Sequence, residues 1–194
     1  MKKAVLAFAI ALSLSACAST KAPPRNPDNA CAIMSERRDY ARAMSAVERR
    51  WGIPVHVQLA TMHQESSFRG DAKPPRKKPF LFIIPRGRIS SAYGYSQALD
   101  GTWAEYKAGP GRGIARRDNI HDAADFMGWY MADSSKRLGI ARSDAYSQYL
   151  AYHEGKGGYA RGSHRSKPWL LGVASKVEVR SQRYRAQLAS CGRR

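Results

Sequence analysis

The chain has 194 residues, of which 43% are hydrophobic and 25% are charged. This is enough apolar material for the core of one ordinary domain, so a fully disordered chain and a collagen-like or heptad-repeat rod are excluded. Lysine and arginine number 33 against 15 acidic residues, and the formal net charge of +18 favours an acidic partner. Nucleic acid, an anionic membrane and an acidic polymer are the three candidate classes.

The N-terminus has the anatomy of a secretory signal peptide. Lys2 and Lys3 form a basic start, and an uncharged, mostly apolar run follows from Ala4 to Leu14. This run is too short for the ~20 residues that a helix needs to cross a bilayer, and the small residues after it are typical of a cleavage site. We therefore expect an exported protein and no nucleic-acid partner.

The end of this segment resembles the lipobox of bacterial lipoproteins, in the order Leu14-Ser15-Ala16-Cys17. The resemblance implies a signal peptide over residues 1–16 and a lipid on Cys17. Because Ala18 rather than Asp follows the cysteine, it also implies an anchor at the periplasmic face of the outer membrane. The alternative is ordinary signal cleavage nearby, with Cys17 an incidental thiol.

Residues 17–30 hold three prolines and no apolar period, so we expect a flexible tether before a domain over 31–194. That domain is predicted to be mainly helical. The first long helix ends at Gly52 and has apolar residues at helical intervals, at Tyr40, Met44, Val47 and Trp51. Pro54 suits the first position of a second helix, which runs into Glu65.

The segment from Asp71 to Ser91 interrupts the helical pattern. Four prolines forbid a continuous helix there, so we expect either a short β-hairpin or a long ordered loop. Basic residues surround its apolar run, at Lys73, Arg76, Lys77, Lys78, Arg86 and Arg88. Loops of this length inside a compact domain are usually functional or mobile.

Four more helices are predicted after this segment. Asp100 is expected to cap a short helix, and Asn119 opens a long one. Ser143 opens the next helix, and Pro168 opens the last.

Glu65 is the first candidate for chemistry, because it ends a helix with an apolar face. A carboxyl group held against apolar surface has a raised pKa, stays protonated near neutral pH and is suited to general acid catalysis. Alone, the position also fits a solvated glutamate. Three segments in order, however, resemble the three motifs of lytic transglycosylases, namely Glu65-Ser66-Ser67-Phe68, Gly94-Tyr95-Ser96-Gln97 and Ala151-Tyr152-His153-Glu154-Gly155.

Lytic transglycosylases are murein-cleaving bacterial enzymes, and the resemblance, over about residues 51–177, implies a goose-type lysozyme-like helical domain. It implies that Glu65 is the single catalytic acid and that Ser66 orients that region. It also implies that Gln97 faces the sugar and that Tyr152 hydrogen-bonds near the catalytic carboxyl group. Ser66 and Tyr95 are further candidates for a sugar contact.

The motifs also depart from the family pattern. Tyr95 and Ser96 replace Leu and Met, His153 replaces Asn, and Glu154 replaces Ala. We keep His153 as a candidate sugar contact.

The resemblance implies cleavage of the MurNAc–GlcNAc β-1,4 bond with formation of 1,6-anhydro-MurNAc, by one glutamate acting as acid and then as base. Two alternatives stay open. A lysozyme-like hydrolase needs a second carboxylate, for which Asp71, Asp100 and Glu154 are candidates. The other alternative is a non-catalytic peptidoglycan-binding lipoprotein on the same scaffold. The expected partners are glycan strands and, through the lipid, the membrane; we expect a monomer.

If Cys17 carries lipid, Cys31 and Cys191 remain, one at each end of the domain. An oxidising compartment favours a disulfide between them; the alternative is two free thiols. The bridge would close a loop of about 160 residues and contribute on the order of 5 kcal/mol. No cysteine or histidine spacing indicates a metal site, and no cofactor is predicted.

Overall fold

The protein is described here by a computed structural model of residues 22–76 and 87–192. These residues form α1 (Ala30–Glu36), α2 (Arg38–Trp51), α3 (Val55–Ser66), α4 (Asp100–Ala108), α5 (Ile120–Leu138), α6 (Ala145–Ala160), η1 (Ser163–Ser166, a 3-10 helix) and α7 (Pro168–Ser190). In the described ranges, β-type pairing is limited to two isolated antiparallel bridges, Arg76 with Arg88 and Tyr93 with Ala98. The prediction of a mainly helical, lysozyme-like domain is therefore confirmed.

Several helix ends lie where local sequence signals predicted them. Gly52, with φ of 71°, ends α2 in the left-handed conformation. The Asn119 side chain accepts hydrogen bonds from the backbone N–H groups of His121 and Asp122, at 2.9 and 3.3 Å, and so caps α5. Pro168 occupies the first position of α7.

Three predicted helix starts are wrong by one residue. Asp100 is the first residue of α4 rather than its cap, and its carboxylate pairs with Arg117 at 2.8 Å instead of bonding the helix backbone. α6 is capped by Asp144, whose carboxylate accepts from the N–H of Ser147 at 2.9 Å, and not by Ser143. Pro54 is the cap of α3, which begins one residue later.

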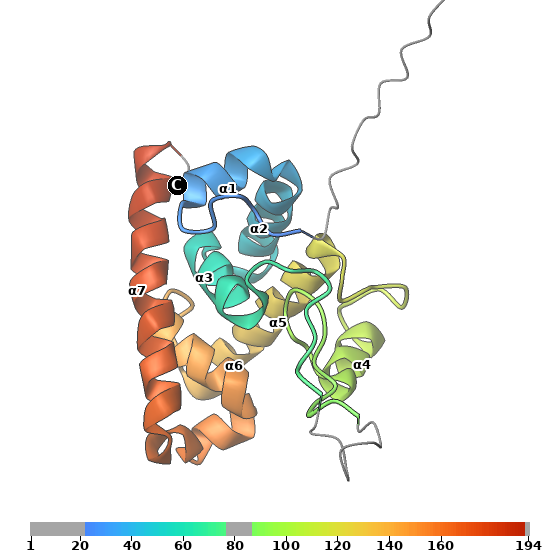
Figure 1. The fold of residues 1–194 in the computed structure, drawn as a ribbon. Helices are drawn as coiled ribbons and strands as arrows, with labels where there is room; N and C mark the ends of the chain where they lie inside the picture. Colours follow the sequence, from blue (N-terminus) through green and yellow to red (C-terminus); the bar gives the residue numbers. More distant parts are fainter. Residues whose placement is uncertain (1–21, 77–86, 193–194) are drawn as a thin grey trace, which may run out of the picture.

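α3 is the central helix, and it packs against α2, α6 and α7. In Figure 1 the long α7 runs along one side, while α4 lies at the opposite side of the molecule. The main core gathers residues of α1, α2, α3, α5, α6 and α7, and a smaller aromatic core between α4 and α5 contains Trp103, Tyr106 and Phe126. Burial of α3 from several sides makes it a rigid support for the residues at its C-terminal end.

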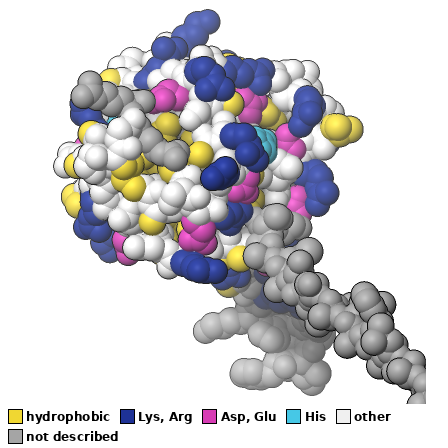
Figure 2. Space-filling model, turned by 90° about the horizontal axis from the view of Figure 1, so that it is seen from above, with side chains coloured by type: hydrophobic (Ala, Val, Ile, Leu, Met, Phe, Trp, Pro, Cys, Tyr) yellow, Lys and Arg dark blue, Asp and Glu magenta, His cyan; other side chains and the backbone are white. Residues whose placement is uncertain are grey.

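Figure 2 shows Lys and Arg side chains spread over the face seen from above, with Asp and Glu side chains between them. On this face the positive charge is not gathered into one patch. Among the described residues, no helix combines the length and the apolar character that crossing a bilayer requires.

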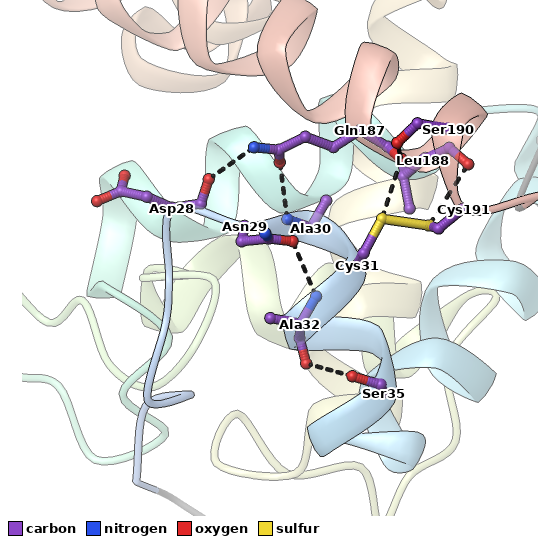
Figure 3. The surroundings of a disulfide bond; sticks show 10 residues. All are labelled: Asp28, Asn29, Ala30, Cys31, Ala32, Ser35, Gln187, Leu188, Ser190 and Cys191. Carbon is purple, nitrogen blue, oxygen red and sulfur yellow. Dashed lines mark hydrogen bonds between the residues drawn. A yellow bond between two sulfur atoms is a disulfide. The ribbon is translucent and has the colours of Figure 1, made fainter.

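Residues 22–30, the last part of the expected flexible tether, contact the domain. Arg37 donates to the carbonyl of Ala22 at 2.6 Å, and the hydroxyl of Tyr184 donates to the carbonyl of Pro27. The Gln187 side chain accepts from the N–H of Ala30 at 2.8 Å (Figure 3). Residues 17–21 and the predicted signal peptide lie outside the described residues.

The predicted disulfide between Cys31 and Cys191 is confirmed (Figure 3). Their Cα atoms lie 6.4 Å apart, within the range that a disulfide spans. The bridge joins α1 to the end of α7, across a sequence separation of 160 residues.

The two legs of the segment 71–91 lie side by side. Arg76 pairs with Arg88 in an isolated antiparallel bridge, and the N–H of Ile89 donates to the carbonyl of Pro75 at 3.2 Å. The rest of the segment, residues 77–86, lies outside the described residues, so the choice between a hairpin and a loop stays open.

Candidate active site

Glu65 lies in the last turn of α3, where the chain turns away abruptly. Ser67 and Phe68 both adopt the left-handed conformation, with φ of 51° and 62°. Such a conformation costs about 1–3 kcal/mol for each non-glycine residue. It is held by the ring of Phe68, which is fully buried, and by Tyr40, whose hydroxyl donates to the Phe68 carbonyl at 3.1 Å. The helix therefore ends at Ser66, one residue after Glu65.

Burial raises the pKa of Glu65 to about 7, and a hydrogen bond from Tyr149 partly offsets this effect. Desolvation disfavours the charged carboxylate, whereas the phenol donor favours it. Glu65 as a whole is half-buried rather than fully enclosed. Near neutral pH the group is thus populated in both forms, as a residue that first gives and then takes a proton requires.

Two tyrosines of α6 lie beside this carboxyl group. Burial first, and then the charge of Glu65, raise the pKa of both Tyr149 and Tyr152. The hydroxyl of Tyr152 donates to the carbonyl of Ser96 at 2.6 Å. Tyr152 therefore links α6 to the segment of the second motif. Tyr149, which bonds Glu65, was missed at the sequence level, although it lies three residues before Tyr152 and so on the same helix face.

The second motif forms a tight turn against the loop that precedes α5. Gly94 has φ of 79°, and a Cβ atom there would lie 2.1 Å from the carbonyl oxygen of Arg117, so no other residue fits. Gln97 has φ of 49°, and its amide nitrogen donates to the carbonyls of Ala72 and Gly94 at 3.0 and 2.8 Å. The Gln97 side chain therefore links the turn at Gly94 to the chain segment at Ala72.

Two expected sugar contacts lie elsewhere. Tyr95 is 1% exposed, and its ring packs edge-on against Tyr40 with centroids 5.8 Å apart. We therefore correct that assignment: Tyr95 belongs to the core, because its aromatic ring fills space behind the turn. The hydroxyl of Ser66, also buried, donates to the Met62 carbonyl at 3.2 Å within its own helix, which suits an orienting role rather than a sugar contact.

The third motif places His153 at the surface and Glu154 inside a cluster of donors. Lys167 donates to both carboxylate oxygens of Glu154 at 2.8 Å, Ser163 donates to one of them, and Nδ1 of His153 lies 3.2 Å away. The hydrogen bonds from Lys167 and Ser163 lower the pKa of Glu154 to about 2. Glu154 is therefore ionised at neutral pH.

The other two candidates for a second carboxylate are also next to cations. Asp71 lies 3.8 Å from Arg69, and Asp100 lies 2.8 Å from Arg117. Each is largely exposed, with 62% and 69% of the side chain accessible. Burial raises the pKa of Glu65, whereas hydrogen bonds from Lys167 and Ser163 lower that of Glu154.

Comparison with known families agrees with this geometry. A family model described as Transglycosylase SLT domain matches residues 5–191. No curated protein matches the chain. Because the family match covers nearly the whole sequence, the chain belongs to the transglycosylase SLT domain family, the family of lytic transglycosylases that its three motifs resemble.

Proposed function

We propose that the protein is a peptidoglycan lytic transglycosylase that cleaves the β-1,4 bond between MurNAc and GlcNAc and forms 1,6-anhydro-MurNAc. The observation that carries this proposal is the carboxyl group of Glu65, a half-buried residue at the end of α3, whose pKa burial raises to about 7. The family match supports the general activity, and the chemistry of this one group supports the specific product.

The reaction needs one group that changes roles. Protonated Glu65 donates its proton to the glycosidic oxygen, the bond from that oxygen to C1 of MurNAc breaks, and GlcNAc leaves with a free 4-hydroxyl group. The resulting Glu65 carboxylate accepts the proton of the MurNAc C6 hydroxyl as this oxygen bonds to C1. The anhydro ring closes, Glu65 is protonated again, and no water is consumed. The hydrogen bond from Tyr149 stabilises the carboxylate between the two steps.

The neighbouring residues hold the two sides of this site together. In this proposal Tyr152 ties α6 to the second motif through Ser96, and Gln97 keeps that motif in its tight turn. His153 is exposed and contacts the sugar, while Ser66 supports the last turn of α3. Positioning of this kind keeps the reacting atoms close to Glu65.

The lysozyme-like alternative is disfavoured by the state of the other carboxylates. A hydrolase with two carboxylates needs the second one free to act on a water molecule or on the sugar. Glu154 is enclosed by donors, and Asp71 and Asp100 lie beside arginines.

We further propose a monomer that is anchored through a lipid on Cys17 at the periplasmic face of the outer membrane. The disulfide between Cys31 and Cys191 supports an oxidising compartment such as the periplasm. Labelling with radioactive palmitate tests the anchor: the parent protein should be labelled and Cys17→Ser should not.

Product analysis in heavy-oxygen water tests the reaction. Purified protein is incubated with murein in H₂¹⁸O, and the released muropeptides are analysed by mass spectrometry. We expect anhydro products that are lighter by one water than lysozyme products and that carry no ¹⁸O. Reducing ends with one ¹⁸O would identify a hydrolase. A folded protein that sediments with murein but releases nothing would identify the binding lipoprotein.

A further inference from the structure

A row of aromatic side chains leads from Glu65 to an exposed indole. Tyr149 bonds the Glu65 carboxyl group, and its ring centroid lies 6.4 Å from that of His153, one turn further along α6. The His153 ring in turn meets Trp169 edge to face, with centroids 5.3 Å apart and an interplanar angle of 77°. Trp169 is the second residue of α7 and is 59% exposed.

Glu154 contacts both Lys167, which precedes the indole in the chain, and His153, on which the indole packs. Its carboxylate, only 4% exposed, accepts two hydrogen bonds from Lys167, which lies directly before Pro168 and Trp169. The same carboxylate lies 3.2 Å from Nδ1 of His153, the ring beneath the indole. The chain entering α7 and the imidazole are thus fastened to one group, which fixes the position of the indole before any ligand binds.

The indole lies beside a charged pair with no net charge. Lys167 and Glu154, the charged pair beside the indole, neutralise each other. An exposed, rigid indole next to a polar site binds ligands that have one apolar face and a polar rim. A pyranose ring has this character, whereas the charged groups of a stem peptide would find no free partner in this pair.

We propose that the indole of Trp169 binds a sugar ring of the glycan strand beyond the sugars at Glu65, and that Glu154 is a positioning residue for this indole. The inference rests on the proposed function, because it takes the glycan strand as the ligand. It predicts that long strands, which reach from Glu65 to Trp169, bind more tightly than short fragments. It also assigns a role to the glutamate that stands where the family has alanine.

The binding test uses soluble, uncrosslinked glycan strands of two lengths and the full chain with Glu65→Gln, so that no strand is cleaved during calorimetry. Trp169→Ala should weaken the binding of long strands by about tenfold and leave short fragments unaffected. Trp169→Phe should restore most of the affinity. Val179→Ala is the matched control, since Val179 is an apolar residue of α7 that is 57% exposed.

Kinetics with active protein test the same point independently. Trp169→Ala should raise KM for long strands and leave kcat unchanged. Glu154→Gln should weaken long-strand binding about threefold, a part of the tenfold effect of the indole itself. Trp169→Ala should weaken long-strand binding less in the Glu154→Gln variant than in the parent, because the two residues act on one contact. A purely structural role of Glu154 would weaken long and short strands alike.

The outcomes separate the two proposals. If the parent cleaves murein and Trp169→Ala binds long strands as well as the parent does, the role of the indole is refuted and the proposed function stands. If the parent cleaves nothing but long strands still bind through Trp169, the indole is retained and the enzyme is refuted. If strands of neither length bind and none is cleaved, both proposals are refuted.

Discussion

Glu65 in α3 and Glu154 in α6 are the same residue type in opposite environments. At the end of α3, burial raises the pKa of Glu65 to about 7. In α6, hydrogen bonds from Lys167 and Ser163 lower the pKa of Glu154 to about 2. Both carboxyl groups lie close to the same stretch of α6, since Tyr149 bonds the first and His153 contacts the second.

The difference teaches that the partners of a glutamate decide whether it exchanges protons near neutral pH. Desolvation without a cationic partner favours the protonated form, and an ammonium donor favours the charged form. Glu154 therefore adds a negative charge to the third motif without adding a second acid. We assign acid–base chemistry to Glu65 and a fastening role to Glu154.

The largest expected effect is the loss of cleavage in Glu65→Gln. Glutamine keeps the shape of the side chain but can neither give nor take the proton, and a general acid or base contributes about 100- to 10,000-fold. The rate of murein cleavage should fall by a factor near the upper end of this range, because one group serves both steps. Release of soluble muropeptides measures this loss.

Glu105→Gln, at an exposed residue of α4, is the matched control and should cleave like the parent. The melting temperature of Glu65→Gln at neutral pH should be no lower than that of the parent, because the substitution removes a carboxylate whose burial is unfavourable. Full activity in the folded variant would overturn the assignment of Glu65.

The second effect is the pH dependence of cleavage. The free enzyme must carry the proton on Glu65 to start the reaction, so kcat/KM should fall above a pH of about 7, by tenfold for each further pH unit. Initial rates of muropeptide release between pH 5 and 9 measure this decline in kcat/KM. A decline that begins near the ordinary pKa of glutamate would show that burial does not raise the pKa of Glu65.

The smallest effect is the loss of stability in Glu154→Ala. The substitution removes the acceptor of Lys167 and Ser163, which should lower the free energy of unfolding at pH 7 by about 2 kcal/mol and the melting temperature by about 4 to 8 °C. Because the folded-state pKa of Glu154 is depressed to about 2, this contribution is present above pH ~4.5 and is lost as the pH falls toward 2.

Thermal unfolding of Glu154→Ala and the parent at several pH values measures this contribution. The pH at which cleavage declines should be the same in both proteins, since Glu154 does not exchange the catalytic proton. If cleavage declined at a different pH in Glu154→Ala, the ionisation of Glu65 would depend on Glu154, and the two glutamates would not have separate roles.

Much of the fold was predictable because helix boundaries depend on neighbours in the chain. A glycine in the left-handed conformation, an asparagine cap and a proline at a helix start act on the nearest backbone groups, as at Gly52, Asn119 and Pro168. The same reasoning misplaced Asp100, because its carboxylate pairs with Arg117 in the loop between α4 and α5. It also missed the binding of residues 22–30, whose partners lie mostly on α7.

The sequence by itself determined that the domain is helical, that Glu65 ends a helix within an ordered set of motifs, and that Cys31 and Cys191 stand at the two ends of the domain. Only the tertiary structure decided that Tyr95 fills the core and that Tyr149 donates to Glu65. It alone decided that Lys167 neutralises Glu154. The physical reason is that burial and pairing are properties of helices brought together, and they set the pKa of a carboxyl group, whereas a motif records only which residues follow one another.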